Sequence, residues 1–296
     1  MIFTFSNLEG GMRHITIIYK RSREQAAQLA QELKTWLESR HIQVSCQQNI
    51  DDSGAGIRCT AKKLDIAPES DCVVVLGGDG TFLSVARFIE NRNTGIIGVN
   101  LGGLGFLTEI SLENCYTELE RVLAGQYEIE ERMRLTVSVL RQDREVFRQS
   151  VLNDAVINKG ALARILDLKT RIDNRYLTDY RADGLIVATP TGSTAYNISA
   201  GGPIVYPTAL AIILTPICSF TLTNRPIILP ATATVEVELP STTPDIALTC
   251  DGQVGCELGP FDRIVITASP NPLRLIKTPS VDYLEILRTK LKWGQS

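Results

Sequence analysis

The ten residues Cys72-Val-Val-Val-Leu-Gly-Gly-Asp-Gly-Thr81 carry the strongest indication of the fold in the first part of the chain. The first five form an uninterrupted apolar run, which is typical of a strand buried on both faces of a parallel sheet. A glycine-rich turn follows, and residues 81–90 have the pattern of a helix. A strand, a glycine-rich turn and a helix in this order predict a ligand site at the carboxyl end of the strand.

The segments around this stretch alternate between strand-like and helix-like patterns. Residues 15–19, 42–46 and 94–99 are short runs rich in β-branched side chains. Residues 23–40 carry apolar side chains at a spacing of three and four, which predicts an amphipathic helix. We therefore predict an α/β domain over residues 13–125, with a parallel sheet that has helices on both faces.

The pattern changes after residue 125. Residues 135–139, 235–239 and 246–250 alternate wholly or largely between apolar and polar side chains, which indicates half-buried strands of an antiparallel sheet. We predict a β-rich domain over residues 126–275. The last part of the chain, 276–296, has leucines at helical spacing, and we expect a C-terminal helix that packs back on the fold.

Composition limits the classes of function. The 296 residues are 44% hydrophobic and have a net charge of −3, with no block of basic residues, so we expect no nucleic-acid partner. Only two histidines are present, which excludes a metal site built from several histidines. The seven cysteines contain no C-x-x-C pair, which favours reduced thiols and a cytoplasmic protein. No apolar run approaches the roughly 18 residues of a membrane span, so we expect no membrane association.

The turn Gly77-Gly-Asp-Gly-Thr81 has the chemistry of a phosphate site. Glycines let the backbone approach a ligand closely, and the amide groups at the start of a helix favour phosphate. The carboxylate of Asp79 beside a phosphate is electrostatically unfavourable, which suggests that it has a role. It could orient a hydroxyl nucleophile or help to hold a divalent cation. The alternative is a tight turn whose aspartate caps the helix. The segment matches neither a P-loop nor the G-x-G-x-x-G pattern of dinucleotide-binding folds.

A second segment runs from Asp183 to Pro203 and contains Thr189-Pro-Thr-Gly-Ser-Thr-Ala-Tyr196. A predicted strand, 185–188, ends here in small hydroxylated residues and glycines. Their hydroxyl groups and exposed amides suit anionic oxygens. The ring of Tyr196 suits stacking on a base or a bond to a ribose. The alternative is a structural loop that is rich in glycine, threonine and proline.

The third segment is the pair Asn153-Asp154, which interrupts an apolar, strand-like run. Buried polar groups without partners would cost stability. An amide and a carboxylate together suit the paired hydroxyl groups of a ribose. The alternative is a bulge or a turn at the edge of a strand.

Together the three segments resemble the NAD kinase family, which carries a GGDGT loop, an Asn-Glu or Asn-Asp pair and a TPTGSTAY-type segment in this order. The likeness runs from about residue 13 to the end of the chain. Further agreement lies in Asn100-Leu-Gly-Gly-Leu-Gly-Phe-Leu-Thr108, Tyr180-Arg-Ala-Asp-Gly184, Thr215-Pro-Ile-Cys218, Arg225-Pro226, Asp251-Gly-Gln253 and Lys290-Leu-Lys-Trp293. One departure is Asp154, which is shorter by one methylene than the glutamate frequent in the family.

The resemblance implies an N-terminal α/β domain, a C-terminal β-rich domain and a site between them. It implies transfer of a phosphoryl group from ATP or polyphosphate to the 2′-hydroxyl of the adenosine ribose of NAD, which makes NADP. Asp79 would be the catalytic carboxylate. The residues implied to bind NAD are Asp79, Gly80, Phe106, Asn153, Asp154, Arg164, Arg181, Asp183, Thr194, Ala195, Tyr196, Asn197, Ile198, Ser199 and Gln253.

We also expect a divalent cation, Mg²⁺, held by phosphate oxygens and water, because the sequence shows no dedicated cage of carboxylates. The family is commonly dimeric or tetrameric, which implies a homodimer or homotetramer. Two alternatives remain open. A lipid or sugar kinase would share the Gly77-Gly-Asp-Gly-Thr81 turn, and a non-catalytic dinucleotide sensor would keep the binding residues without needing Asp79.

Overall fold

The computed structural model describes residues 11–21, 24–49, 64–89, 93–160, 165–221, 223–239, 245–279 and 282–294. The chain divides into two compact units. Of the described residues, unit 1 holds those up to Glu131 and those from Leu273 onward, and unit 2 holds Arg132–Pro272. The chain therefore leaves unit 1, forms unit 2 and returns.

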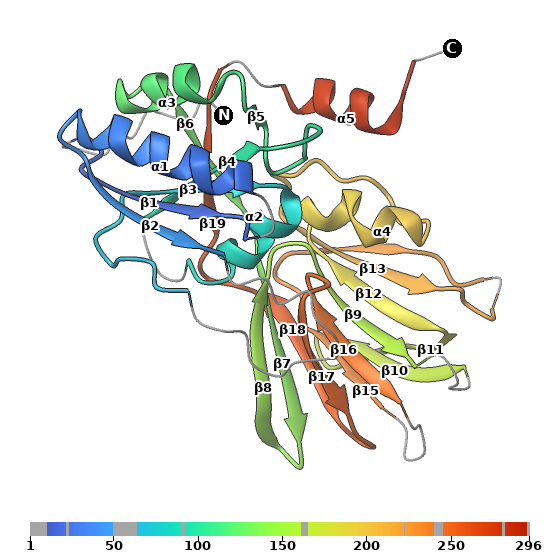
Figure 1. The fold of residues 1–296 in the computed structure, drawn as a ribbon. Coiled ribbons are helices and arrows are strands. Elements are labelled where there is room, and N and C mark those ends of the chain that lie inside the picture. The colour runs from blue at the N-terminus through green and yellow to red at the C-terminus, as the bar shows by residue number, and fades with distance from the viewer. Residues whose placement is uncertain are drawn as a thin grey trace. The chain divides into compact units, whose positions relative to one another are not determined.

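Unit 1 is built on a seven-stranded sheet in the order β2-β1-β3-β4-β19-β6, with β5 paired to β4 (Figure 1). Its strands are β1 (His14–Tyr19), β2 (Gln43–Gln48), β3 (Cys72–Gly77), β4 (Gly95–Asn100), β5 (Ile110–Ser111), β6 (Glu128–Arg132) and β19 (Leu273–Lys277). Strand β3 pairs in parallel with β1 and β4 and is buried along its whole length, as its apolar run predicts.

Helices cover both faces of this sheet. The described helices of unit 1 are α1 (Glu24–Glu38), α2 (Asp79–Ala86), α3 (Cys115–Leu123) and α5 (Tyr283–Leu291). On one face, Leu33 of α1 and Leu119 of α3 share a core with Val74 of β3. Helix α2 packs against β3, and its buried Phe82 lies outside that core, as does Val73 on the opposite face of β3. The prediction of a parallel sheet with helices on both faces is confirmed.

Helix α2 begins two residues earlier and ends four residues earlier than its pattern predicts, because Gly78 is its N-cap and the chain turns at residues 87–88. Asp79 is therefore the first residue of the helix, where the helix dipole favours a negative charge. Within the part of the chain that the structure describes, no helix combines the length and the apolar character that crossing a membrane requires.

Unit 2 consists of two six-stranded antiparallel sheets that share one apolar core. The first sheet has the order β11-β10-β15-β18-β7-β8, and the second has the order β14-β13-β12-β9-β16-β17 (Figure 1). The strands of the first are β7 (Leu135–Arg141), β8 (Arg144–Val151), β10 (Leu166–Ile172), β11 (Arg175–Ala182), β15 (Val235–Glu238) and β18 (Arg263–Ala268). Those of the second are β9 (Asp154–Lys159), β12 (Gly184–Ala188), β13 (Ala211–Ile217), β14 (Ile227–Pro230), β16 (Ile246–Cys250) and β17 (Val254–Leu258).

The second sheet of unit 2 is covered on both faces at its centre. In β12, Leu185 and Val187 face the shared core, while Ile186 and Ala188 belong to a smaller cluster on the other face. Ala200, which follows the short helix α4 (Tyr196–Ser199), packs against this smaller cluster. A segment after β12 thus folds back over the sheet, which explains why every residue of β12 is buried although the strand is antiparallel.

Candidate active site

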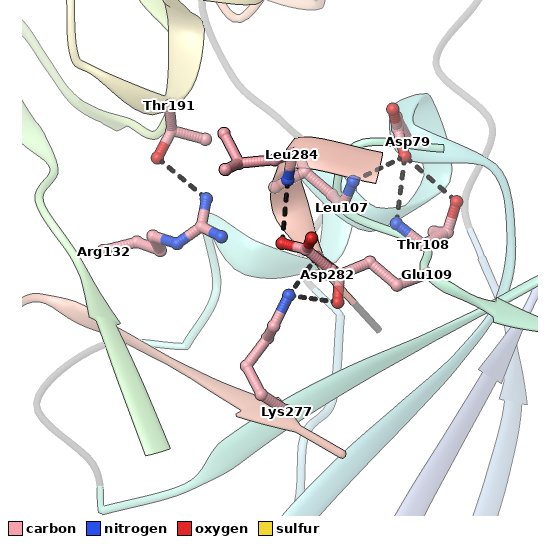
Figure 2. Close-up of polar contacts among 9 residues, drawn as sticks. All are labelled: Asp79, Leu107, Thr108, Glu109, Arg132, Thr191, Lys277, Asp282 and Leu284. Carbon is pink, nitrogen blue, oxygen red and sulfur yellow. Dashed lines mark hydrogen bonds and ion pairs between the residues drawn. The ribbon is translucent and has the colours of Figure 1, made fainter. Parts of the chain in front are cut away.

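The carboxylate of Asp79 is held by a loop of unit 1 that begins where β4 ends. Oδ2 accepts a hydrogen bond from the backbone N–H of Phe106 at 2.9 Å. Oδ1 accepts from the backbone N–H groups of Leu107 and Thr108, both at 3.1 Å, and from the hydroxyl of Thr108 at 3.0 Å (Figure 2). Asp79 therefore does not cap its own helix, and its orientation is set by the loop.

The loop leaves room for this carboxylate and is fixed at its beginning. A Cβ on Gly105 would overlap Oδ1 of Asp79 and the hydroxyl of Thr108, so only glycine fits there. The amide nitrogen of Asn100 donates to the hydroxyl of Thr108 at 2.9 Å, which leaves that hydroxyl to donate to Asp79. Asn100 is the last residue of β4, so the sheet itself positions the donors that surround Asp79.

The turn at Gly77 lies where the order of the strands favours ligand binding. Strand β1 lies between β2 and β3 in the sheet. The chain runs from β1 to β2 on one side and then crosses to β3 on the other side of β1. In open α/β sheets ligands bind outside the carboxyl ends of the strands at such a switch point. Gly80 is exposed and Phe106 is half-buried beside Asp79.

In unit 2, three segments that are far apart in sequence meet at one edge of the second sheet. Asp154 opens β9 and pairs with Ala188 at the end of β12, and Ala155 pairs with Cys250 at the end of β16. The turn before β9, the segment after β12 and the hairpin after β16 therefore lie together. The backbone N–H of Thr189 donates to the carbonyl of Asn153 at 2.8 Å, which joins two of the three segments.

Asp251, in the hairpin between β16 and β17, holds the turn before β9. Its carboxylate accepts hydrogen bonds from the backbone N–H groups of Leu152 at 3.0 Å, Asn153 at 2.7 Å and Asp154 at 3.2 Å. The residue has a φ of 51°, and Gly252 follows with 63°. Asp251 is absent from the site residues predicted from the sequence, although the Asp-Gly pair itself indicates a tight hairpin.

Asp154 is buried, with 4% of its surface exposed. Burial, and secondarily the negative charge of Asp251, raises the pKa of its carboxyl group to about 7. Of the two sequence interpretations of Asn153-Asp154, the turn at the start of a strand describes the local backbone. Both residues of this turn also line a pocket.

That pocket has a volume of about 340 Å³ and lies wholly in unit 2. It follows one face of β9 from Asp154 to Asn158. At a rise of about 3.3 Å per residue this spans roughly 13 Å, which suits an elongated ligand. Its lining residues are Asn153, Asp154, Val156, Asn158, Ala195, Tyr196, Thr249, Asp251 and Gly252. The structure thus brings four predicted site residues together, namely Asn153, Asp154, Ala195 and Tyr196.

The segment after β12 divides into buried and exposed residues. The hydroxyl of Ser193 is fully buried, donates to the carbonyl of Pro190 and accepts from the backbone N–H of Val205, so it is not available to anionic oxygens as the sequence suggested. Thr191 accepts a hydrogen bond from Arg132 at 3.4 Å (Figure 2). The remaining predicted residues of this segment differ in exposure: Tyr196 and Ser199 are exposed, and Thr194, Ala195 and Ile198 are half-buried.

Asn197 is fully buried and its side chain is used inside the protein. Its amide nitrogen donates to the carbonyls of Ser193 and Pro203, and its amide oxygen accepts from the hydroxyl of Thr215 at 2.6 Å. These bonds fix α4, and with it Tyr196, on the sheet. The structure gives Asn197 a supporting position, and a direct contact with NAD stays a prediction.

Three more predicted residues of unit 2 do not line the pocket. Asp183 precedes Gly184, which pairs with Asn158, so it lies toward the other end of the pocket, where Lys159 binds it at 2.7 Å. Arg181 is exposed and lies over the ring of Phe220. Gln253 follows Gly252 in the hairpin after β16. Arg164 lies outside the described residues.

Among the residues that the structure describes, no three His, Cys, Asp or Glu side chains gather so that they could hold a metal ion. This finding concerns a cage built by the protein. A cation that is bound mainly by the oxygens of substrate phosphates needs no such cage.

Comparison with known proteins identifies the family. Residues 15–127 match the model of the ATP-NAD kinase N-terminal domain, and residues 152–278 match that of the ATP-NAD kinase C-terminal domain. An NAD kinase of Syntrophobacter fumaroxidans is 65% identical over 285 residues, which cover 96% of this chain and all of that protein. An NAD kinase of Geotalea daltonii is 50% identical over 286 residues, with the same coverage.

Two solved structures have the same fold. Yeast NADH kinase in complex with NADH superposes with a TM-score of 0.84 at 26% identity, over 97% of this chain and 90% of that one. An NAD kinase from Archaeoglobus fulgidus in complex with ATP gives a TM-score of 0.73 at 26% identity, over 94% and 98% of the two chains. With both domains matched in order and relatives that align along their full length, the chain belongs to the NAD kinase family and is a kinase that transfers a phosphoryl group to NAD.

Proposed function

We propose that the acceptor is the 2′-hydroxyl of the adenosine ribose of NAD and that Oδ2 of Asp79 receives its hydrogen bond. A carboxylate has about four acceptor positions. Oδ1 of Asp79 accepts three hydrogen bonds and Oδ2 accepts one, so the described residues leave one position of Oδ2 open. This arrangement of the four donors around Asp79 is the observation that carries the proposal.

The chemistry expected of Asp79 is orientation of the hydroxyl and late acceptance of its proton. Phosphoryl transfer passes through a loose transition state, so positioning and charge neutralisation matter more than early deprotonation. A carboxylate that is fixed by four donors does not have to reorganise when the hydroxyl arrives. General-base help of this kind contributes about 10²- to 10⁴-fold in rate.

The pocket of unit 2 is proposed to bind NAD. The side chains of Asn153 and Asp154 supply an amide and a carboxyl group to a ribose, and the exposed ring of Tyr196 supplies a surface for stacking. Asp183 lies toward the far end of the face that lines the pocket, where it suits another polar part of an extended dinucleotide.

ATP or polyphosphate is proposed as the donor, with Mg²⁺ bound by the donor phosphates and water. The cation would neutralise charge on the transferred phosphoryl group. On the protein side, the amide groups at the start of α2 are suited to phosphate oxygens. Gly78 has space around its Cα, because a Cβ placed there would meet nothing within 4 Å, so a ligand can approach the backbone closely.

The test is to incubate the purified protein with Mg²⁺ and each combination of NAD or NADH with ATP or polyphosphate. We expect NADP with at least one donor. A product phosphorylated anywhere other than the 2′-hydroxyl, identified by NMR, would contradict the proposed acceptor. A panel of lipids and sugars as acceptors tests the alternative kinase classes, and binding of NAD without turnover would favour a sensor.

We further propose that the enzyme is a cytoplasmic homodimer or homotetramer. The six described cysteines are free thiols, which suits a reducing compartment. Leu210 and Phe220 of unit 2 are large apolar side chains that are mostly exposed, which suits contact with a second copy. Light scattering during size-exclusion chromatography measures the mass of the particle, and the mass of a monomer would contradict the oligomer.

A further inference from the structure

A buried ion pair in unit 1 joins the loop around Asp79 to the strand on which the chain returns. The ammonium group of Lys277 binds both carboxylate oxygens of Glu109 (Figure 2). The side chains are only 13% and 7% exposed, respectively. Lys277 is the last residue of β19, and Glu109 directly follows Thr108, whose backbone and hydroxyl both donate to Asp79.

Such a pair is weak evidence for stability, because removing two charges from water costs about as much as their attraction returns. A better-attested use of buried ions is to select one arrangement of the chain among several. The arrangement that this ion pair can select is that of residues 106–108. These residues supply every hydrogen bond that Asp79 accepts from the described residues.

The two ends of this loop are held differently. At its beginning, Asn100 bonds Thr108 and also accepts from the backbone N–H of Gly102 at 2.7 Å. At its end, Glu109 is held by Lys277 on β19, a strand that pairs in parallel with β4. The ion pair thus ties the last donor residue, Thr108, to the strand next to β4 in the sheet.

We propose that Glu109 and Lys277 are positioning residues for Asp79. The pair keeps the three amide groups of residues 106–108 in place, and these amides in turn fix the rotation of the Asp79 carboxylate and the direction of its Oδ2. The proposal rests on the role of Asp79 proposed above. It requires that loss of the pair impairs turnover even where the protein remains stable.

The central experiment uses the double variant Glu109→Gln/Lys277→Met, which removes both charges and leaves neither uncompensated. We expect only a small fall in the temperature of thermal unfolding, because no charge is left unpaired and only the introduced amide loses the ammonium group as a partner. We expect kcat to fall about 10- to 100-fold, because small misplacements of reacting groups have effects of this size. The KM for NAD should stay within about threefold of the wild-type value, as for an interaction that acts mainly in the transition state.

A second readout is independent of catalysis. Hydrogen exchange at the amides of Phe106, Leu107 and Thr108 should be slow in the wild type, because Asp79 accepts from all three. It should be faster in the double variant. Unchanged exchange together with a kcat within twofold of the wild type would overturn the proposal, and so would a kcat that falls only in proportion to the folded fraction.

Two further variants keep the test decisive. Glu109→Asp retains both charges but shortens the tether, so kcat should fall even if the double variant does not fold, and an unchanged kcat in a folded Glu109→Asp protein would overturn the proposal. The control is Glu118→Gln/Arg121→Met, which removes an ion pair of α3 in the same unit with one nearly buried partner. Its kcat should match the wild type.

Asp79→Asn separates the two proposals. If it retains full turnover, the role of Asp79 fails whatever the pair does. If it loses turnover while the pair variants keep kcat and slow exchange, only the positioning role of Glu109 and Lys277 fails.

Discussion

The carboxylate of Asp251 accepts a hydrogen bond from the backbone N–H of Asp154 at 3.2 Å, and the side chain of Asp154 is buried near that negative charge. One aspartate thus fixes the position of the other and at the same time disfavours its ionisation. Burial, and secondarily the charge of Asp251, raises the pKa of Asp154 to about 7, so an acid at the edge of the proposed NAD pocket has a pKa in the physiological range.

The first prediction concerns how stability depends on pH. The pKa of Asp154 is raised in the folded state, so the folded protein keeps this proton while the unfolded chain loses it near the ordinary aspartate pKa of 3.8. The contribution to the free energy of unfolding is therefore fully present below pH 4 and is lost as the pH rises toward about 7. For a shift of this size the loss is on the order of 4 kcal/mol.

Asp154→Asn removes this titration. Urea unfolding of both proteins at pH 5 and pH 8 should show that the wild type loses about 2–3 kcal/mol more than the variant between the two pH values, because only part of the shift lies above pH 5. If the free energy of unfolding changes equally in the two proteins between these pH values, the pKa of Asp154 is not raised by folding.

The second prediction concerns Asp79. In the wild type both oxygens of Asp79 accept hydrogen bonds from backbone N–H groups. In Asp79→Asn one of these oxygens is replaced by an NH₂ group, which cannot accept, so at least one hydrogen bond is lost. Formation of NADP should fall at least about 100-fold, with the overall fold retained. Circular dichroism checks the fold and a coupled assay checks turnover, and undiminished turnover would remove Asp79 from its proposed role.

The third prediction compares two glycines of one loop. Gly105→Ala would push a methyl group into Asp79 and Thr108, so the loop must move and turnover should fall about 100-fold. Gly103→Ala is the matched control, because a Cβ there meets nothing within 4 Å and its φ is not left-handed. Equal kcat values for the two variants would argue against a tightly fitted loop.

The fourth prediction concerns the three amide groups that Asp251 holds. In Asp251→Asn at least one of these bonds is weakened, and a hydrogen bond to a charged group is worth about 1.5–3 kcal/mol, so the KM for NAD should rise about tenfold or more. The charge that helps to raise the pKa of Asp154 also disappears, so that pKa should fall.

Asp173→Asn is the control for Asp251→Asn. Asp173 has a similar φ of 50° in another hairpin of unit 2 and accepts from the backbone N–H of Thr234 at 2.8 Å. It lines no part of the pocket described above. Its KM for NAD should match that of the wild type, and an equal rise in both variants would point to a general effect on unit 2.

The fifth prediction concerns Asn197. In Asn197→Ala the carbonyls of Ser193 and Pro203 and the hydroxyl of Thr215 lose their partner, and two of these three bonds are buried, so the free energy of unfolding should fall by about 2–3 kcal/mol. Ser199→Ala, at an exposed residue of the same helix, should change it by less than about 0.5 kcal/mol. Urea unfolding measures both, and equal small changes would contradict the supporting position of Asn197.

Local patterns predict much of this fold. The apolar run that begins at Cys72 becomes the doubly buried β3, and the alternation around Val235 becomes β15, with Val235 and Val237 buried. The glycine-rich turn follows the carboxyl end of β3 and leads into a helix, as the order of strand, turn and helix in the sequence predicts. These features depend on the order of residues within short segments of the chain, so they can be predicted from the sequence.

Other features depend on which segments meet. Five residues at Leu273–Lys277 have the pattern of a strand, but nothing in that pattern says that they join the sheet of unit 1 beside β4 after the chain has passed through unit 2. Asp251 reaches the turn before β9 across 98 residues of sequence, because β16 pairs with β9. Ser193 has a hydroxyl that suggests a ligand, and only packing shows that the protein uses it internally.

The amino-acid sequence alone therefore determined the family, the two classes of domain and the segments that carry polar chemistry, because motifs and hydrophobic periodicity are local properties of the chain. Only the tertiary structure decided that the carboxylate of Asp79 is held by a distant loop, that burial raises the pKa of Asp154, and that Lys277 binds Glu109 at the end of that loop. Hydrogen bonds, desolvation and the attraction of charges depend on distances in space, and folding sets those distances between residues that are far apart in sequence.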